Sequence, residues 1–162
     1  MRRWLLRFSL LALLAAAFPL QAATFRGVVS RVTDGDTLWV RPGGHGEAVE
    51  IRLVDVDAPE TCQAFGPQAT RALTARVLHQ TVVVRTRGVD EYQRTLAQVR
   101  HRGYDLNAWL VREGHAWSST FHGRRGPYAK LEDEARQAHL GLWASSSAVE
   151  PRQFRRSHGR CL

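Results

Sequence analysis

The chain has 162 residues, of which 23 are lysine or arginine and 15 are aspartate or glutamate, giving a formal net charge of +8 at pH 7. This length predicts one domain with its own hydrophobic core, and the chain has no internal repeat or low-complexity tract that would indicate a repeat array. The excess of positive charge favours a polyanionic partner, because lysine and arginine replace the counterions condensed on phosphates, although a solvated basic surface would give the same charge.

The first 22 residues have the pattern of a secretory signal peptide. They contain three arginines near the start, an apolar run over residues 10–18, and small residues suited to cleavage near Ala22–Ala23. The apolar run is short for a membrane-spanning helix, and an uncleaved membrane anchor is the alternative. Removal of residues 1–22 would lower the net charge from +8 to +5. We expect an exported protein, periplasmic or secreted, with no stable membrane association after processing.

The first part of the mature chain is rich in residues that favour strands. Three β-rich runs are predicted to be strands, over residues 25–32, 37–40 and 49–56. Asp34-Gly35 is typical of a turn between the first two. Pro59 lacks an amide donor and restrains Ala58, so the third strand is expected to end before it.

Helical and strand patterns then alternate to the end of the domain. Helices are predicted over residues 66–78, 105–113 and 128–139, and strands over residues 81–87 and 95–100. This order predicts an α+β fold, a small antiparallel barrel of five strands with about three helices beside it. The domain is expected to cover residues 23–144, followed by a polar and basic tail over residues 145–162.

Acidic residues gather between the first turn and the end of the third strand. They are Asp34, Asp36, Glu47, Glu50, Asp55, Asp57 and Glu60. Carboxylates that lie close together repel one another unless a cation joins them. The cluster offers oxygen ligands with no cysteine or histidine, so calcium or magnesium fits it better than zinc.

Three motifs in this region and beyond carry a resemblance to a known family. They are Asp34-Gly35-Asp36-Thr37, then Arg52-Leu53 leading to Asp57-Ala58-Pro59-Glu60-Thr61, then Asp90-x-Tyr92-x-Arg94. In this order and spacing the chain resembles staphylococcal nuclease and its thermonuclease relatives, with weaker similarity from about Thr24 to Trp143. Each motif alone has little specificity, whereas the three in order are specific.

The resemblance implies an oligonucleotide-binding (OB) type barrel and a Ca²⁺-dependent nuclease. Such an enzyme hydrolyses DNA and RNA with little sequence preference and leaves 3′-phosphate ends. It also implies that Asp36 and Asp57 bind Ca²⁺ directly and that the backbone carbonyl of Ala58 is a further ligand. Relatives often carry threonine in place of Ala58, a change that a carbonyl contact survives. Asp34 is expected to shape the turn or support the ligands.

The same resemblance assigns catalytic roles to three further residues. Glu60 would act as the general base, or bind the attacking water. Arg52 and Arg94 would bind phosphate through their planar guanidinium groups and stabilise charge in the transition state. Tyr92 would contact a phosphate or a nucleotide. The structural alternatives are a salt bridge from Arg52 to a neighbouring aspartate, a surface position for Arg94, and packing of Tyr92 on the barrel rim.

Two departures from the family pattern lie next to these residues. Asp55 stands where relatives commonly carry a small or apolar residue, and Gln93 stands where a glycine often precedes the arginine. If the backbone at Gln93 needs a positive φ, glutamine costs of order 1 kcal/mol there.

Strict alternation along the predicted third strand would place Arg52 and Asp57 on opposite faces. Both can line one site only if the chain bends between them.

Cys62 and Cys161 are the only cysteines, and export into an oxidising compartment favours a disulfide between them over two free thiols. That bond would hold the basic tail beside the loop after Glu60. Tail arginines such as Arg155 are expected mainly to affect nucleic-acid binding and its salt dependence.

Two other classes of function fit parts of the pattern. The barrel could hold single-stranded nucleic acid without catalysis, or the same chemistry could serve a phosphatase acting on small substrates. The complete set of motif residues favours the nuclease over the first, and the basic tail favours a polymeric substrate over the second. We expect a monomer.

Overall fold

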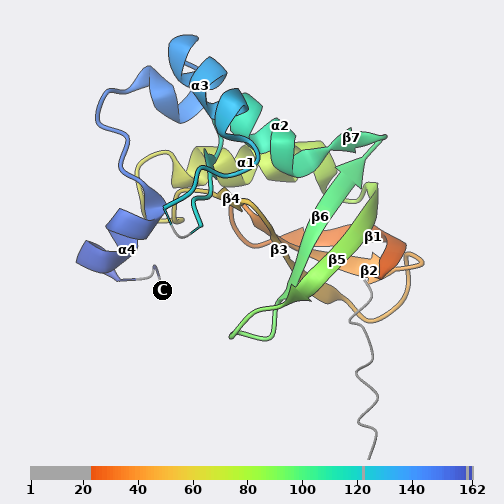
Figure 1. Ribbon diagram of the computed structural model, residues 1–162. Coiled ribbons are helices and arrows are strands. Elements are labelled where there is room, and N and C mark those ends of the chain that lie inside the picture. Colours follow the sequence, from red (N-terminus) through yellow and green to blue (C-terminus); the bar gives the residue numbers. More distant parts are fainter. Residues whose placement is uncertain (1–22, 122, 160, 162) are drawn as a thin grey trace, which may run out of the picture.

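The computed structural model describes residues 23–121, 123–159 and 161 (Figure 1). The predicted signal peptide, residues 1–22, lies outside the described residues. Within the part of the chain that the structure describes, each helix is too short or too polar to cross a membrane.

A closed five-stranded barrel forms the centre of the fold. Its strands are β1 (Thr24–Val32), β2 (Thr37–Pro42), β3 (Val49–Leu53), β5 (Thr81–Val89) and β6 (Thr95–His101). They pair in the order β3-β2-β1-β5-β6, antiparallel throughout, and a parallel pairing of β3 with β6 closes the barrel. A short strand, β7 (Tyr104–Asp105), extends the sheet beyond β6. The predicted α+β fold with an OB-type barrel is confirmed.

Alternating apolar side chains of the strands fill the barrel. Those that are fully buried include Val29, Leu38, Val40, Ile51, Val82, Val84, Ala97 and Val99. Every second residue of a strand points to the same face, so Val82 and Val84 of β5, like Ala97 and Val99 of β6, point into the barrel. This packed interior is the rigid support on which the site is built.

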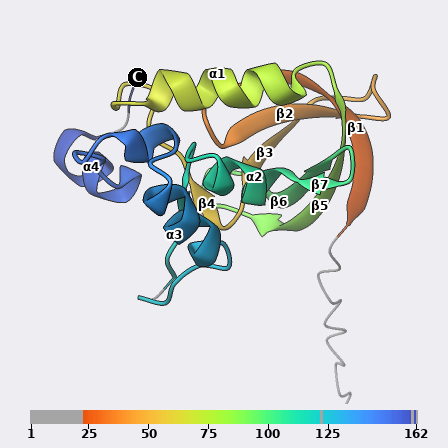
Figure 2. The same cartoon turned by 90° about the horizontal axis from the view of Figure 1, so that it is seen from above.

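Helices cover one side of the barrel. Within the described residues they are α1 (Gly66–Val77), α2 (Leu106–Arg112), α3 (Ala129–Gln137), α4 (Pro151–His158) and the 3₁₀-helix η1 (Gly141–Ala144). Figures 1 and 2 show α1 running along the barrel and α4 set apart at its end, beside the loop that leads into α1. Leu73 of α1 and Leu110 of α2 are fully buried against the barrel core.

The structure differs from the predicted elements in two places. The predicted strand over residues 49–56 is broken, because β3 ends at Leu53 and a turn separates it from β4 (Val56–Asp57), which pairs with β8 (Trp117–Ser118). The expected tail contains a helix, α4, whose proline lies in the first turn, where a missing amide donor costs nothing. This helix is short and strongly polar, so it lacks the regular spacing of apolar residues from which a helix can be predicted.

Candidate active site

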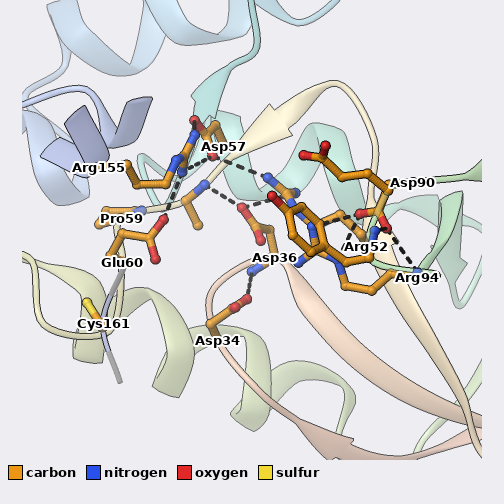
Figure 3. Close-up of a pocket in the computed structure, with 13 residues that line it drawn as sticks. Asp34, Asp36, Arg52, Asp57, Pro59, Glu60, Asp90, Arg94, Arg155 and Cys161 are labelled. Carbon is orange, nitrogen blue, oxygen red and sulfur yellow. Dashed lines mark hydrogen bonds and ion pairs between the residues drawn. The ribbon is translucent and has the colours of Figure 1, made fainter. Parts of the chain in front are cut away.

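The predicted site residues share one pocket of about 420 Å³. Those that line it are Asp36, Arg52, Asp57, Ala58, Glu60, Tyr92 and Arg94. Figure 3 shows them converging from the barrel and from the loop before α1. The pocket also contains residues that the motifs did not assign to catalysis, above all Asp90 and Arg155.

Strand pairing brings the three motifs together. Thr37 lies opposite Arg52 in the β2–β3 pair, so Asp36 emerges beside the Arg52 side chain. The parallel β3–β6 pairing sets Ile51 opposite Thr95, which brings Arg94 to the same rim. The closure of the barrel therefore builds the pocket from segments that are distant in the sequence.

The turn between β3 and β4 places Arg52 and Asp57 on the same side. Asp55 adopts a left-handed conformation with φ of 64°, which aspartate tolerates better than most residues. The buried Asn107 holds the turn, since its amide nitrogen donates to the carbonyl of Val54 at 2.8 Å. The chain thus bends at residues 54–55, and Arg52 donates to Asp57 at 3.2 Å.

Asp36 is a buried carboxylate surrounded by charges. One of its oxygens accepts the Ala58 backbone N–H at 2.6 Å and lies 3.1 Å from the Arg52 guanidinium. Burial raises the pKa of Asp36 well above its ordinary value; Arg52 opposes this shift, and repulsion from Asp34 and Asp57 adds to it. Asp34 shapes the turn by accepting the Asp36 N–H at 3.0 Å. A further cation beside Asp36 would relieve the cost of its buried charge.

The oxygen atoms of Asp36 and Asp57 fit a hard divalent cation. Both carboxylates pair with the Arg52 guanidinium, Asp36 at 3.1 Å and Asp57 at 3.2 Å, so they lie on either side of one cationic group. Within residues 23–121, 123–159 and 161, the structure gathers no group of three or more histidine, cysteine, aspartate or glutamate side chains suited to a metal. A cation there would take two carboxylates, and carbonyl oxygens or water would complete its ligands, as Ca²⁺ accepts.

Glu60 is positioned by the loop that leads into α1. The Gln63 side-chain oxygen accepts the Glu60 N–H at 3.1 Å. Gly66 is required at the end of this loop, because a Cβ there would overlap the carbonyl oxygen of Glu60. The Glu60 carboxylate extends into the pocket, 22% exposed.

Arg155 of α4 reaches into the pocket and pairs with both acids of the second motif. Its guanidinium engages both oxygens of Asp57, at 3.1 and 3.0 Å, and one oxygen of Glu60 at 2.8 Å. Burial lowers the pKa of Arg155, but the hydrogen bonds and charges of Asp57 and Glu60 outweigh it and raise the pKa above its usual range. From the sequence, Arg155 was expected in a basic tail that binds nucleic acid, and its contact with the site was not predicted. The pairing of Cys62 with Cys161 was the one signal for it.

A disulfide joins Cys62 to Cys161, with a Cα–Cα distance of 5.7 Å. The segment that carries α4 runs from Val149 to Cys161, and its first residue is also held. The buried Gln63 donates from its amide nitrogen to the carbonyl of Val149 at 2.6 Å. Gln63 therefore links the backbone of Glu60 to the chain that carries α4, a role that no motif indicated.

Arg94 and Tyr92 lie on the turn between β5 and β6. Arg94 pairs with Asp90 at 2.7 Å, and its guanidinium lies 5.3 Å from the centre of the Tyr92 ring. Gln93 has φ of 63°, so the backbone does require the positive φ considered from the sequence. Asp90 accepts the backbone N–H groups of both Tyr92 and Arg94, which keeps the turn in register despite the absence of glycine.

Comparison with known proteins identifies the family of the chain. The family described as staphylococcal nuclease homologue matches residues 50–145. The chain belongs to the staphylococcal nuclease family. It is 41% identical to Protein ParB of Escherichia coli over an aligned length of 157 residues, and the match covers 90% of this chain and 87% of that protein.

Two further relatives carry nuclease names. The chain is 38% identical over 146 residues to a micrococcal nuclease of Shigella flexneri, covering 83% of each. It is 35% identical over 128 residues to an uncharacterized endonuclease of Haemophilus influenzae, covering 79% of this chain and 71% of that one. The resemblance seen in the motifs is confirmed, and this staphylococcal nuclease homologue is a nuclease that acts on nucleic acid.

Proposed function

We propose that this nuclease is Ca²⁺-dependent, that it hydrolyses phosphodiester bonds of DNA and RNA with little sequence preference, and that it leaves 3′-phosphate ends. The observation that carries the proposal is the convergence of Asp36, Asp57 and Glu60 with Arg52 and Arg94 on one open pocket. Oxygen-only ligands favour a hard cation, and paired arginines favour a phosphate substrate.

Asp36 and Asp57 would hold the cation, with the backbone carbonyl of Ala58 as a further ligand. When bound, Ca²⁺ would neutralise negative charge on the phosphate and orient water at the site. Arg52 lies between the two carboxylates, where its fork can bind two phosphate oxygens as the substrate enters. Arg94 approaches the pocket from the β5–β6 turn, and Tyr92 beside it would contact the nucleotide.

Glu60 would take a proton from the attacking water. The water oxygen bonds to phosphorus and the bond from phosphorus to the 5′ oxygen breaks. The 5′ oxygen takes up a proton from solvent and leaves as a hydroxyl, and the phosphate stays on the 3′ side. Arg52 and Arg94 stabilise the charge that builds on the phosphate oxygens, an effect that is strongest where donors are already positioned. Glu60 is partly exposed at the pocket wall, so a water molecule can reach it.

We also propose that the protein is exported, to the periplasm or out of the cell, and acts as a monomer. A disulfide between the two cysteines of the chain supports an oxidising compartment. Cleavage of residues 1–22 would leave no membrane attachment. Intact-mass measurement of the protein exported by a bacterial host tests this, and a species that retains Met1 would favour an anchored form.

The function is tested by incubating the purified protein with supercoiled plasmid and with single-stranded RNA, in Ca²⁺ and in chelator. We expect both substrates to be cut in Ca²⁺ and neither in chelator, and the new DNA ends to support polymerase extension only after phosphatase treatment. Cleavage that survives chelation would contradict the role of the cation. Retained binding without cleavage in Ca²⁺ would favour a binding module.

A further inference from the structure

The contact between Arg155 and the acids of the site is the strongest feature that the proposed mechanism leaves unused. The guanidinium occupies both oxygens of Asp57 and one oxygen of Glu60. All three side chains are mostly buried, with exposed fractions of 29% for Arg155, 13% for Asp57 and 22% for Glu60. A paired fork of this kind is among the strongest polar contacts in proteins.

The segment that carries Arg155 is held at both ends. Gln63 binds the carbonyl of Val149 before α4, and the disulfide fixes Cys161 after it. Both anchors belong to the loop that carries Glu60. Arg155 is therefore presented to the site from within the same molecule, at a high effective concentration, and no other partner is needed.

A divalent cation at Asp57 needs the oxygen atoms that Arg155 holds. The two positive groups also repel each other at short range. Binding of the cation at Asp57 must therefore weaken the contact of Arg155 with Asp57. By thermodynamic linkage, the Arg155 contact weakens cation binding to the same extent.

We propose that Arg155 is a built-in competitor of the divalent cation, and that the disulfide-held helix α4 thereby sets the cation concentration at which the nuclease becomes active. This inference rests on the proposed Ca²⁺ dependence. In the cation-free protein, Arg155 balances the charges of Asp57 and Glu60 and keeps the pocket assembled. When the cation binds, Arg155 leaves Asp57, and Glu60 Oε1 becomes available to accept a hydrogen bond from water.

The test is calorimetric titration of the purified, disulfide-bonded protein with Ca²⁺ alone. Arg155→Gln removes the charge and should tighten Ca²⁺ binding about tenfold or more, because charge-assisted hydrogen bonds to Asp57 are lost. Arg155→Lys keeps the charge but loses the planar guanidinium, so its Ca²⁺ affinity should lie between those of the wild type and the Arg155→Gln variant. The matched control is Arg156→Gln on the exposed side of the same helix, which removes an equal charge and should stay within about twofold of the wild type. Equal or weaker binding by the Arg155→Gln variant would overturn the proposal.

A second variant tests the tether. Replacement of both cysteines by serine should also tighten Ca²⁺ binding, by a smaller factor than Arg155→Gln, because the helix is no longer held covalently. Unchanged affinity in this variant would remove the disulfide from the proposal. Circular dichroism spectra of all variants establish that each is folded.

Plasmid cleavage measured in parallel separates this inference from the proposed function. If Ca²⁺-dependent cleavage is present and the Arg155→Gln variant binds Ca²⁺ like the wild type, the competition fails and the function stands. If neither the wild type nor the Arg155→Gln variant binds Ca²⁺ and cleavage is absent, the competition and the proposed function both fail.

Discussion

Asp36 affects the stability of the cation-free protein and is also a ligand of the cation that we propose. Its raised pKa, caused first by burial, means that the ionised form is unfavourable in the folded protein. The cation-free protein should therefore gain stability as the pH falls from the raised pKa of Asp36 towards its ordinary value of 3.8, since the folded state binds the extra proton.

Replacement of Asp36 by asparagine should remove this pH dependence and weaken cation binding. We expect the Asp36→Asn variant to be more stable than the wild type at neutral pH in chelator, measured by urea unfolding. The Ca²⁺ concentration for half-maximal cleavage should rise roughly tenfold or more, because one charged ligand is lost. A wild-type response to Ca²⁺ would exclude Asp36 as a ligand.

Glu60 is the residue whose chemistry is tested most directly. Glu60→Gln keeps the shape and the ability to accept from Arg155, but removes the proton acceptor. Turnover at saturating Ca²⁺ should fall by about 10²–10⁴-fold, while nucleic acid still binds. The control is Glu47→Gln in the exposed β2–β3 loop, which should leave turnover unchanged. Equal rates for the Glu60→Gln variant and the wild type would remove Glu60 from the mechanism.

Gln93 carries a backbone cost that glycine would relieve. At φ of 63°, a side chain is strained by about 1 kcal/mol or more, which the greater flexibility of glycine in the unfolded chain partly offsets. Gln93→Gly should raise the free energy of unfolding by about 0.5–1 kcal/mol, measured by urea titration. Gln93→Ala keeps the Cβ and should give no gain; an equal gain from both would show that strain is not the cause.

At the scale of elements, the turn between β3 and β4 decides where the acids point. Asn107 at the start of α2 is fully buried and joins this turn to β6. It donates to Val54 and accepts the N–H of Val99 at 3.1 Å. One amide side chain therefore couples the helix, the barrel and the segment that carries Asp57.

Asn107→Ala should leave these backbone groups without partners. We expect a loss of about 2–4 kcal/mol in the free energy of unfolding, since each buried unpaired group costs about 1–3 kcal/mol. Activity should fall as well, because the position of Asp57 relaxes. Arg112→Ala, at an exposed position of the same helix, is the control and should change stability by no more than about 0.5 kcal/mol. A similar small effect from Asn107→Ala would contradict this role.

At the scale of the whole molecule, the disulfide makes the end of the chain part of the pocket. It links residues 99 apart in the sequence, so in the unfolded chain it closes a loop over residues 62–161, while β1 to β4 lie outside that loop. Chain-entropy estimates for a loop of this length reach about 4.7 kcal/mol, and measured effects are typically about 2–4 kcal/mol.

Reduction of the disulfide should therefore lower global stability by about 2–4 kcal/mol, seen as a lower urea midpoint for the reduced protein. Serine at both cysteine positions should reproduce the effect without reductant. Identical midpoints for the oxidised and reduced protein would show that α4 unfolds separately from the barrel.

The sequence alone determined the class of fold, most element positions and many of the residues that line the pocket, but not Arg155. Runs rich in β-branched and apolar residues predicted the barrel strands because such residues favour an extended, buried backbone. Motifs such as Asp57-Ala58-Pro59-Glu60 are local, so their residues can be recognised without knowing what they contact. The positive φ at Gln93 could also be considered from the sequence. Relatives often carry glycine at this position, and glycine indicates a backbone with positive φ.

Tertiary structure decided which charges meet. Arg155 and Asp57 lie 98 residues apart. Their contact depends on the disulfide, which the two cysteines predicted, and also on Gln63 and on the direction of α4, neither of which has a local pattern. The bend at Asp55 likewise depends on Asn107, 53 residues away from Val54. The local sequence specifies which residues form helices and strands. An ion pair between distant residues also needs those helices and strands to be fixed relative to one another, and only the packed core fixes them.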